Sequence, residues 1–163
     1  MYAAQLHYLG RWYNTARLAV EVQGGYGDTV ISALRDRTAG RPPYPTLYRH
    51  RLDSQAAKPE QKRFGWPTNS VTRPKILNQL ERHLRERTLP WVTHRLVAEM
   101  RTFIEDDRRP SPRAQSGAHD DCVMAAAIAV EMFRQLGDFE HRRRSQRKRS
   151  ARPPVSYPWQ HAA

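Results

Sequence analysis

Two adjacent carboxylates, Asp120 and Asp121, are the residues of this chain best suited to do chemistry. They follow the turn-forming Gly117 and precede an almost wholly apolar segment, which predicts that they stand at the N-terminus of a buried helix. The helix dipole stabilises carboxylates there by about 0.3–1 kcal/mol at exposed sites, so the pair could simply cap the helix. Alternatively, a divalent cation offsets their mutual repulsion, since Mg²⁺ and Mn²⁺ prefer hard oxygen ligands.

A third carboxylate, Glu21, interrupts the apolar run that begins at Leu18. A lone glutamate in a strand could face solvent or pair with an arginine. If this strand lies beside the helix of Asp120, however, the three carboxylates converge at one end of a sheet. Two Mg²⁺ or Mn²⁺ ions held there would activate a water molecule and stabilise the leaving oxygen in phosphodiester cleavage.

The order of elements around Glu21 predicts an α/β layer. An amphipathic helix, a short strand, a glycine-rich turn and a second helix follow one another, and Asp28 or Thr29 is expected to cap that second helix. A segment rich in proline and glycine comes next, with one short extended piece. The predicted ranges are 2–13 for the first helix, 18–22 for the strand, 40–67 for the loops and 47–49 for the extended piece.

The second half of the chain predicts mainly helices. Thr72 is expected to cap a third helix with Pro74 in its first turn. Residues 96–104 form either a helix or a helix that runs into a strand, and 108–116 form a loop. Residues 118–136 are apolar nearly all round, which predicts a buried helix packed on a sheet.

Composition indicates a polyanion as partner. The chain has 28 Lys+Arg against 16 Asp+Glu and a net charge of +12, a field that attracts DNA, RNA or an anionic membrane. No apolar run approaches the roughly 20 residues of a membrane-spanning helix, and no secretion signal begins the sequence. The single cysteine fits a reducing cytosol, so we expect a cytoplasmic protein. Residues 139–163 are basic and contain prolines, and they predict a disordered tail behind a domain formed by residues 1–138.

Basic side chains gather near the aromatic residues of the central loops. One interpretation is a DNA-binding surface, because arginine and lysine supply the salt-dependent part of DNA affinity. The other is a solvated loop with Trp66 packed on the core. The basic residues concerned are Arg49, Arg51, Lys58, Lys62, Arg63 and Arg73, around Tyr48, Phe64 and Trp66, whereas Arg82, Arg85 and Arg87 are expected on the outer face of the third helix.

Six short strings occur in order along residues 9–136. They are Tyr13-Asn14-Thr15-Ala16-Arg17-Leu18-Ala19-Val20-Glu21, Tyr44-Pro45-Thr46-Leu47-Tyr48, Gly65-Trp66-Pro67-Thr68-Asn69, Thr72-Arg73-Pro74, Glu99-Met100-Arg101-Thr102-Phe103 and Gly117-Ala118-His119-Asp120-Asp121. In this order they resemble the nuclease domain of phage terminase large subunits. The first and last strings are similar to that family's second and third acidic motifs.

The resemblance implies a partial RNase H-like fold, a sheet flanked by helices, and an endonuclease that cuts concatemeric viral DNA during packaging with two metal ions. It implies Glu21, Asp120 and Asp121 as Mg²⁺ or Mn²⁺ ligands and catalytic residues, with His119 beside them. Glu99 could support that site, or it faces solvent or pairs with a basic side chain. The implied partners are double-stranded DNA and, through the full-length protein, the portal and the small terminase subunit, in a bacterial host cell.

Two features of the family have no counterpart in the printed sequence. The first acidic motif and its strand should precede residue 1, and no phosphate-binding Gly-x-x-x-x-Gly-Lys-Ser/Thr loop of an ATPase occurs. We therefore expect a C-terminal fragment of a phage or prophage protein, whose activity on its own is in question. The alternative function is a non-catalytic, basic DNA-binding or packaging-motor interaction module.

Overall fold

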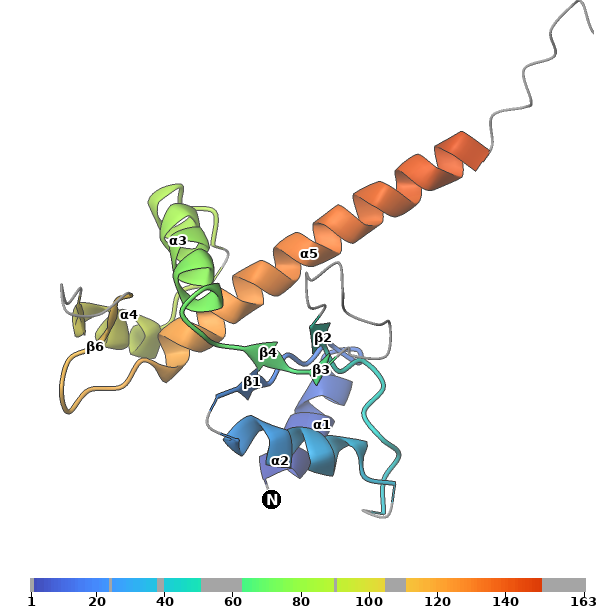
Figure 1. Cartoon of the computed structure of the whole chain (residues 1–163), viewed down its shortest axis with the longest axis horizontal. Helices are drawn as coiled ribbons and strands as arrows, with labels where there is room; N and C mark the ends of the chain where they lie inside the picture. The colour runs from blue at the N-terminus through green and yellow to red at the C-terminus, as the bar shows by residue number, and fades with distance from the viewer. Residues whose placement is uncertain are drawn as a thin grey trace, which may run out of the picture.

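The first part of the long helix α5 lies beside α3 and α4, and α1 and α2 form a separate pair on the other side of the strands (Figure 1). The computed structural model describes residues 2–23, 25–37, 40–50, 63–89, 91–104 and 111–150, with side chains up to residue 137. These residues form a mixed α/β structure of helices and small two-stranded sheets, and one strand pair is parallel. The elements in chain order are α1 (Tyr2–Trp12), β1 (Glu21–Val22), α2 (Tyr26–Arg35), β2 (Arg49–His50), β3 (Arg63–Phe64), β4 (Trp66–Pro67), α3 (Thr72–Arg85), α4 (His94–Arg101), β5 (Phe103–Ile104), β6 (Arg113–Ala114) and α5 (Asp121–Ser150).

Helices α1 and α2 pack against one another and close one side of the structure. Ala3, Leu34 and Tyr44 form their common apolar cluster. The predicted helix, strand and helix at the start of the chain are confirmed, but the predicted cap is wrong. Helix α2 begins after Gly25, which has a φ of 87° and makes no side-chain cap, and Asp28 lies inside the first turn.

The strands are short because each pairs over only two residues. β1 runs parallel to β4, with Glu21 opposite Trp66, and β2 runs antiparallel to β3. An isolated bridge from Leu18 to Leu47 extends the pairing of the β1 segment, so both extended stretches expected from the sequence are present.

The side chains leading into and along β1 alternate between two apolar clusters, as the pleat of a strand requires. Leu18 and Val20 pack against the cluster of α1 and α2. Ala19 instead packs against the larger cluster, to which Trp66 and the buried face of α5 belong. The segment therefore separates the two layers.

Helix α3 starts at Thr72 after Val71, whose side chain makes no cap, so the predicted Thr72 cap is wrong, and Asn69 pairs the amides at this end. The side chain of Asn69 accepts hydrogen bonds from the backbone N–H groups of Val71 and Thr72, at 2.9 Å each. The Thr72 hydroxyl instead donates to the carbonyl of Pro67 at 2.5 Å. Asn69 thus satisfies the first amides of the helix, which a cap residue normally does.

Residues 96–104, for which the sequence left open a helix or a helix followed by a strand, form the latter. Helix α4 runs into strand β5, so the helix-to-strand alternative is correct. Strand β6 pairs antiparallel with β5, with Ala114 opposite Phe103, inside the stretch predicted as a loop. The loop prediction is therefore wrong at β6, and residues 105–110 lie outside the described part of the chain.

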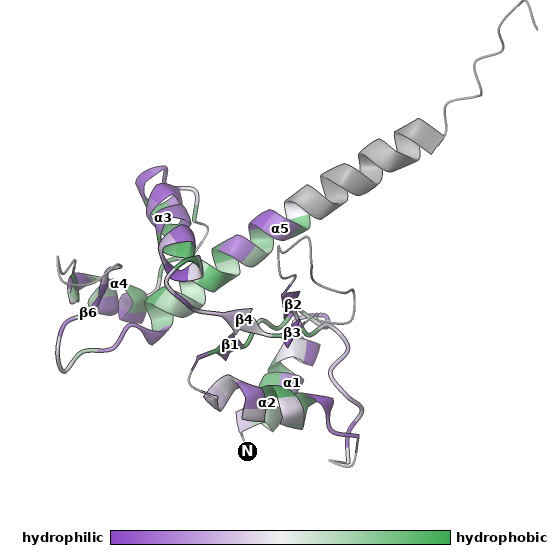
Figure 2. Ribbon diagram, viewed as in Figure 1, coloured by the Kyte–Doolittle hydropathy of each residue, from purple (hydrophilic) through white to green (hydrophobic). Residues whose placement is uncertain are grey.

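Helix α5 buries one face against α3 and α4 rather than mainly against a sheet. Ala127 is wholly buried and Val123 nearly so, whereas Phe133 is 78% exposed, so the helix is not covered all round as predicted. Its apolar part lies beside α3 and α4 (Figure 2). The backbone remains helical through Ser150, beyond the predicted end at residue 136, and residues 151–163 of the expected tail are not described. Within the described residues, no helix is long and apolar enough to cross a membrane.

Candidate functional site

The acidic pair occupies the start of α5, as the sequence predicts. Asp120 immediately precedes the helix and is bound to Arg73 of α3, with 2.5 Å between the guanidinium nitrogen and the carboxylate oxygen. Arg73 also donates two hydrogen bonds to the carbonyl of Pro112, at 3.3 and 3.1 Å. Asp121, the first residue of the helix, is exposed. The two neighbours thus differ, because Asp120 takes part in the packing of three segments and Asp121 is open to solvent.

Glu99 of α4 lies behind the acidic pair and holds the start of α5 in place. Its carboxylate accepts hydrogen bonds from the backbone N–H of Cys122 at 2.6 Å and of Val123 at 3.3 Å. Arg95, one turn earlier, approaches it at 3.5 Å. Only 8% of Glu99 is exposed, so the solvent-facing alternative is wrong, whereas the expected basic partner is present. Two of the amides that a helix start leaves unsatisfied are thereby paired.

Burial and hydrogen bonding oppose each other at Glu99. Burial disfavours the charged carboxylate, but hydrogen bonds from the Cys122 thiol, the two backbone amides and Arg95 outweigh it and lower the pKa of Glu99. The same contact has the opposite effect on the thiol. Burial, followed by the hydrogen bond to Glu99 and the negative charge of that carboxylate, raises the pKa of Cys122. At neutral pH the pair therefore consists of a carboxylate and an uncharged thiol.

Glu21 shares the α5-facing side of β1. Its register partner on the parallel strand is Trp66, which belongs to the cluster formed with α5, and its neighbour Ala19 packs on that cluster too. Val22, on the opposite side, lines a cavity beside α2. Glu21 is half-buried, and its carboxylate makes no hydrogen bond or ion pair with a described residue.

The three predicted ligands do not form a metal centre in this arrangement. Among the described residues, no three His, Cys, Asp or Glu side chains group closely enough to hold a metal ion. The donor chemistry of Asp120 and Asp121 suits a hard cation, but Arg73 already neutralises Asp120. His119 is exposed beside the pair and makes no contact that ties it to the predicted ligands. The carboxylates of the chain therefore fit a divalent cation in kind but not in their present geometry.

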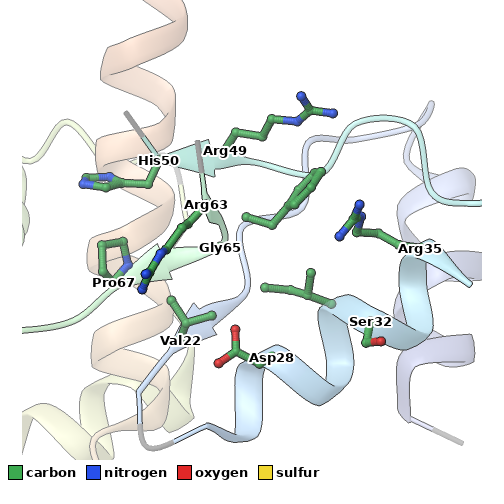
Figure 3. Close-up of a pocket in the computed structure, with 11 residues that line it drawn as sticks. Val22, Asp28, Ser32, Arg35, Arg49, His50, Arg63, Gly65 and Pro67 are labelled. Carbon is green, nitrogen blue, oxygen red and sulfur yellow. The ribbon is translucent and has the colours of Figure 1, made fainter. Parts of the chain in front are cut away.

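A cavity of about 1050 Å³ lies on the other side of β1, between α2 and strands β2 and β3 (Figure 3). Three arginines line it, Arg35 from α2, Arg49 from β2 and Arg63 from β3, and Asp28 is the acidic residue of the described lining. We call this cavity the arginine pocket. Its lining is completed by Val22, Ile31, Ser32, His50, Phe64, Gly65 and Pro67.

Two of these arginines stack on one aromatic ring. The guanidinium carbon of Arg35 lies 4.2 Å from the centre of the Phe64 ring, and that of Arg49 lies 4.5 Å from it. Both arginines are exposed, where the attraction between a cation and the face of a ring contributes about 0.5–1 kcal/mol. Sequence reasoning missed Arg35, because its partner Phe64 is distant in the chain and no local pattern links a helix end to that strand.

The predicted DNA-binding residues divide between two places. Arg49 and Arg63 line the arginine pocket, and Arg73 belongs to the acidic end of α5. The core position of Trp66, which is 2% exposed, agrees with the structural alternative for that residue. Arg82 and Arg85 are exposed on α3, as expected, and Arg87 is exposed just beyond it. Three further predicted residues, Arg51, Lys58 and Lys62, lie outside the described part of the chain.

A second buried carboxylate, Glu131, joins α5 to α3. It is fully buried and receives hydrogen bonds from Arg134, at 2.9 Å to each oxygen, and from Gln135 at 2.9 Å. Lys75 of α3 approaches at 3.7 Å. Burial alone would raise the pKa of Glu131, but these partners lower it to about 2. Glu131 is remote in sequence from the predicted site and serves the packing of the two helices.

Comparison of the chain with known proteins found no similar protein. No protein-family model, no curated protein and no solved structure matches the chain.

Proposed function

We propose that the chain is a nuclease domain of the terminase type, with an RNase H-like arrangement, that hydrolyses phosphodiester bonds of double-stranded DNA with Mg²⁺ or Mn²⁺. One observation supports this most: Ala19, two residues before Glu21 on the same strand segment, and Trp66, the register partner of Glu21, both belong to the packing around α5, the helix that starts at Asp121. By the alternation of a strand, Glu21 is expected on that same side of β1. In this proposal the chain acts during packaging of concatemeric viral DNA, with a portal and a small terminase subunit as partners.

The start of α5 is a suitable support for metal ligands, because Glu99 holds the first amides of the helix. Arg73 links Asp120 to α3 and to the segment of Pro112 while no ion is bound. Ligands must be held within a fraction of an ångström of their working position, which needs neighbours with fixed side chains. Asp121, which is exposed, would meet the ion and the DNA first.

A divalent cation at this place would supply an activated water molecule and would neutralise charge on the phosphate. The residues of the chain have two tasks beforehand. Arg73 has to release one oxygen of Asp120, and Glu21 has to approach the pair, because three donors do not group among the described residues. Arg73, once released, would be free to bind the oxygens of a phosphate.

The test is nicking of supercoiled plasmid DNA by the full chain in Mn²⁺. We expect Asp120→Asn, Asp121→Asn and Glu21→Gln each to reduce nicking by at least about 100-fold, corresponding to roughly 2.7 kcal/mol of transition-state stabilisation. Glu81→Gln is the matched control, since Glu81 is an exposed acid on α3, 61% exposed at its side chain. Nicking that survives the loss of Asp120 would contradict the site assignment.

A second function is favoured by the pairing of Asp120 with Arg73 and by the basic lining of the arginine pocket. In that case the chain is a non-catalytic module that binds DNA or the packaging motor, and the acids of α5 serve its packing. The plasmid assay separates the two functions. DNA binding without any nicking in Mn²⁺ or Mg²⁺, and with unchanged affinity in Asp121→Asn, would support the module.

A further inference from the structure

We propose that the arginine pocket is a binding site for the phosphodiester backbone of a DNA strand, separate from the acidic end of α5. The proposal rests on DNA as the ligand of the chain, as proposed above, but it does not require cleavage. None of the residues that line the pocket belongs to the acidic pair or its supports.

The arginines of the pocket have side chains suited to phosphate oxygens. A guanidinium presents a planar fork of N–H donors, and a phosphate binds to that fork through two parallel hydrogen bonds. Arg35 and Arg49 both contact the ring of Phe64, at 4.2 and 4.5 Å. The ring thus lies next to two guanidinium groups, and neither of them donates a hydrogen bond to a residue that the structure describes.

The charge of the pocket is not neutralised from within the described structure. Arg35, Arg49 and Arg63 form no ion pair with any residue that the structure describes, whereas Arg73 on the far side of β1 does. Asp28 is the acid of the described lining. In Figure 3 its carboxylate is directed from α2 towards the strands, Arg35 and Arg63 come from α2 and β3, and Arg49 extends outward from β2 along the top of the view. The excess of positive charge favours an anion with several charges.

The wall of the pocket is rigid where the strands meet α2. Gly65 has a φ of +89°, and a Cβ atom added there would lie 2.7 Å from Val22, 2.8 Å from Ile31 and 2.8 Å from the carbonyl oxygen of Val20. The backbone therefore touches its neighbours so closely that only glycine fits. This fixes β3, and with it Phe64, against the β1 segment and α2.

The cavity is larger than a free phosphate ion needs. Its volume of about 1050 Å³ lies at the upper end of the roughly 300–1,000 Å³ typical of pockets for small ligands. A single phosphate would contact only one part of such a space. A backbone with successive phosphates would reach arginines on α2, β2 and β3 together.

The test measures DNA affinity over a salt series, with fluorescence anisotropy of a labelled duplex and with EDTA present so that no cleavage occurs. In the variant Arg35→Gln/Arg49→Gln we expect affinity to fall by about 10-fold or more at low salt. The slope of log K against log[salt] should become less negative by about 2, since each phosphate contact contributes about 0.9. The control Arg82→Gln/Arg85→Gln removes the same charge from the exposed face of α3 and should leave the slope within about 0.5 of the parent chain.

Two further measurements identify the kind of ligand that the arginine pocket binds. In Arg35→Lys/Arg49→Lys the charge is kept but the planar fork is lost, and we expect a clear loss of affinity at low salt. Inorganic phosphate, compared with chloride at equal ionic strength, should displace the duplex only weakly. Equal losses in the pocket and control variants, full affinity in the lysine variant, or complete displacement by inorganic phosphate would each overturn the proposal.

The outcomes also distinguish this proposal from the nuclease. If Asp120-dependent nicking occurs while the pocket variants bind DNA like the parent chain, the pocket proposal fails and the nuclease stands. If the pocket variants lose affinity as expected but the parent chain never nicks DNA, the pocket stands and the nuclease fails. Thermal unfolding of each variant shows that a loss of affinity is not a loss of fold.

Discussion

The acidic end of α5 and the arginine pocket lie on opposite sides of β1 and are built in opposite ways. At the acidic end, Arg73 forms an ion pair with Asp120 and Glu99 accepts hydrogen bonds from the helix amides, while Asp121 is open to solvent. In the pocket, Arg35 and Arg49 rest on an aromatic ring and keep their hydrogen-bond donors. The described residues thus contain two kinds of charged side chain, those paired within the fold, such as Arg73 with Asp120, and those without an ion pair, such as Arg35 and Arg49. Charges of the first kind should matter for stability and those of the second kind for binding.

The largest expected effect is on the free energy of unfolding, when a glycine of each region, Gly65 or Gly117, is replaced by alanine. Gly65→Ala should lower the free energy of unfolding by about 4 kcal/mol, because a strained left-handed backbone and a clash with neighbours add together. Gly117, beside the acidic pair, also has a positive φ, of +82°, but nothing lies within 4 Å of an added Cβ. Gly117→Ala should therefore cost only roughly 1–2 kcal/mol. Urea unfolding of both variants measures this, and equal losses would show that the wall of the pocket is not rigid.

Glu131 tests whether a paired charge of α5 stabilises the fold. Glu131→Gln should lower the free energy of unfolding at pH 7 by about 2 kcal/mol, since hydrogen bonds to a charged group contribute about 1.5–3 kcal/mol. Its partners Arg134, Gln135 and Lys75 keep their positions on α5 and α3. Urea unfolding at pH 7 is the measurement, with Glu81→Gln as the exposed control.

The pH dependence of the same variant has a defined sign. The pKa of Glu131 in the folded chain is about 2, below the value of about 4.3 for an unfolded glutamate. Its stabilisation is therefore complete above the unfolded pKa and is lost as the pH falls towards 2. The difference between the parent chain and Glu131→Gln should shrink over that window, and a difference that grows on acidification would contradict the pairing.

Glu99 should contribute somewhat less, because an amide can still accept one of its hydrogen bonds. Glu99→Gln is expected to lower the free energy of unfolding by about 1.5 kcal/mol. The pKa of Glu99 is lowered in the folded chain. Its contribution to the free energy of unfolding is therefore also lost as the pH falls below the pKa of a glutamate in the unfolded chain. Thermal unfolding at neutral and acidic pH checks both statements, and an unchanged midpoint would mean that α5 does not depend on this contact.

Replacement of Arg73 tests whether its ion pair with Asp120 competes with a bound metal ion. Arg73→Gln should cost about 1 kcal/mol of stability, as the ion pair with Asp120 is partly buried. It should also tighten binding of Mn²⁺ several-fold, because the carboxylate loses a competing cation. Electron paramagnetic resonance of Mn²⁺ measures the affinity, and Arg82→Gln serves as the control. Weaker Mn²⁺ binding in Arg73→Gln would show that the arginine organises the ligands instead of competing with the ion.

The smallest effect on stability is expected in the pocket. Arg49→Gln should change the free energy of unfolding by only about 0.5 kcal/mol, the worth of an exposed cation–ring contact. Its DNA affinity should nevertheless fall in low salt. A stability loss as large as that of Glu99→Gln would place Arg49 among the folding charges and would remove the distinction between the two regions.

Elements with a strong helical period could be predicted from the sequence. The apolar stripes of α3 and α5 marked both helices, and the position of Asp120 and Asp121 at the start of α5 followed from Gly117 and the apolar run behind them. The run did not fix where α5 ends, since residues after Gly137 remain helical in a charged sequence. The apolar periodicity thus locates the buried face of a helix but not the residue at which the helix ends.

Contacts between distant segments could not be predicted in this way. Glu99 was placed by its own helix period, which cannot reveal that its carboxylate meets the amides of Cys122 and Val123. Strand β6 consists of two residues, Arg113 and Ala114, too few for any alternation to be seen. The pairing of Arg35 with Phe64 likewise depends on the packing of α2 against the strands. In each case the decisive partner is far along the chain.

The contact between Glu99 and the single cysteine of the chain makes the reactivity of that thiol a measure of local unfolding at the start of α5. Because the pKa of Cys122 is raised, its sulfur is almost entirely protonated at neutral pH and reacts slowly with alkylating reagents while α5 stays docked. Each transient separation of α4 from the start of α5 would release the thiol and let it react. The rate of alkylation would then report how often this helix end detaches, with no label to be introduced and no second cysteine to confuse the reading.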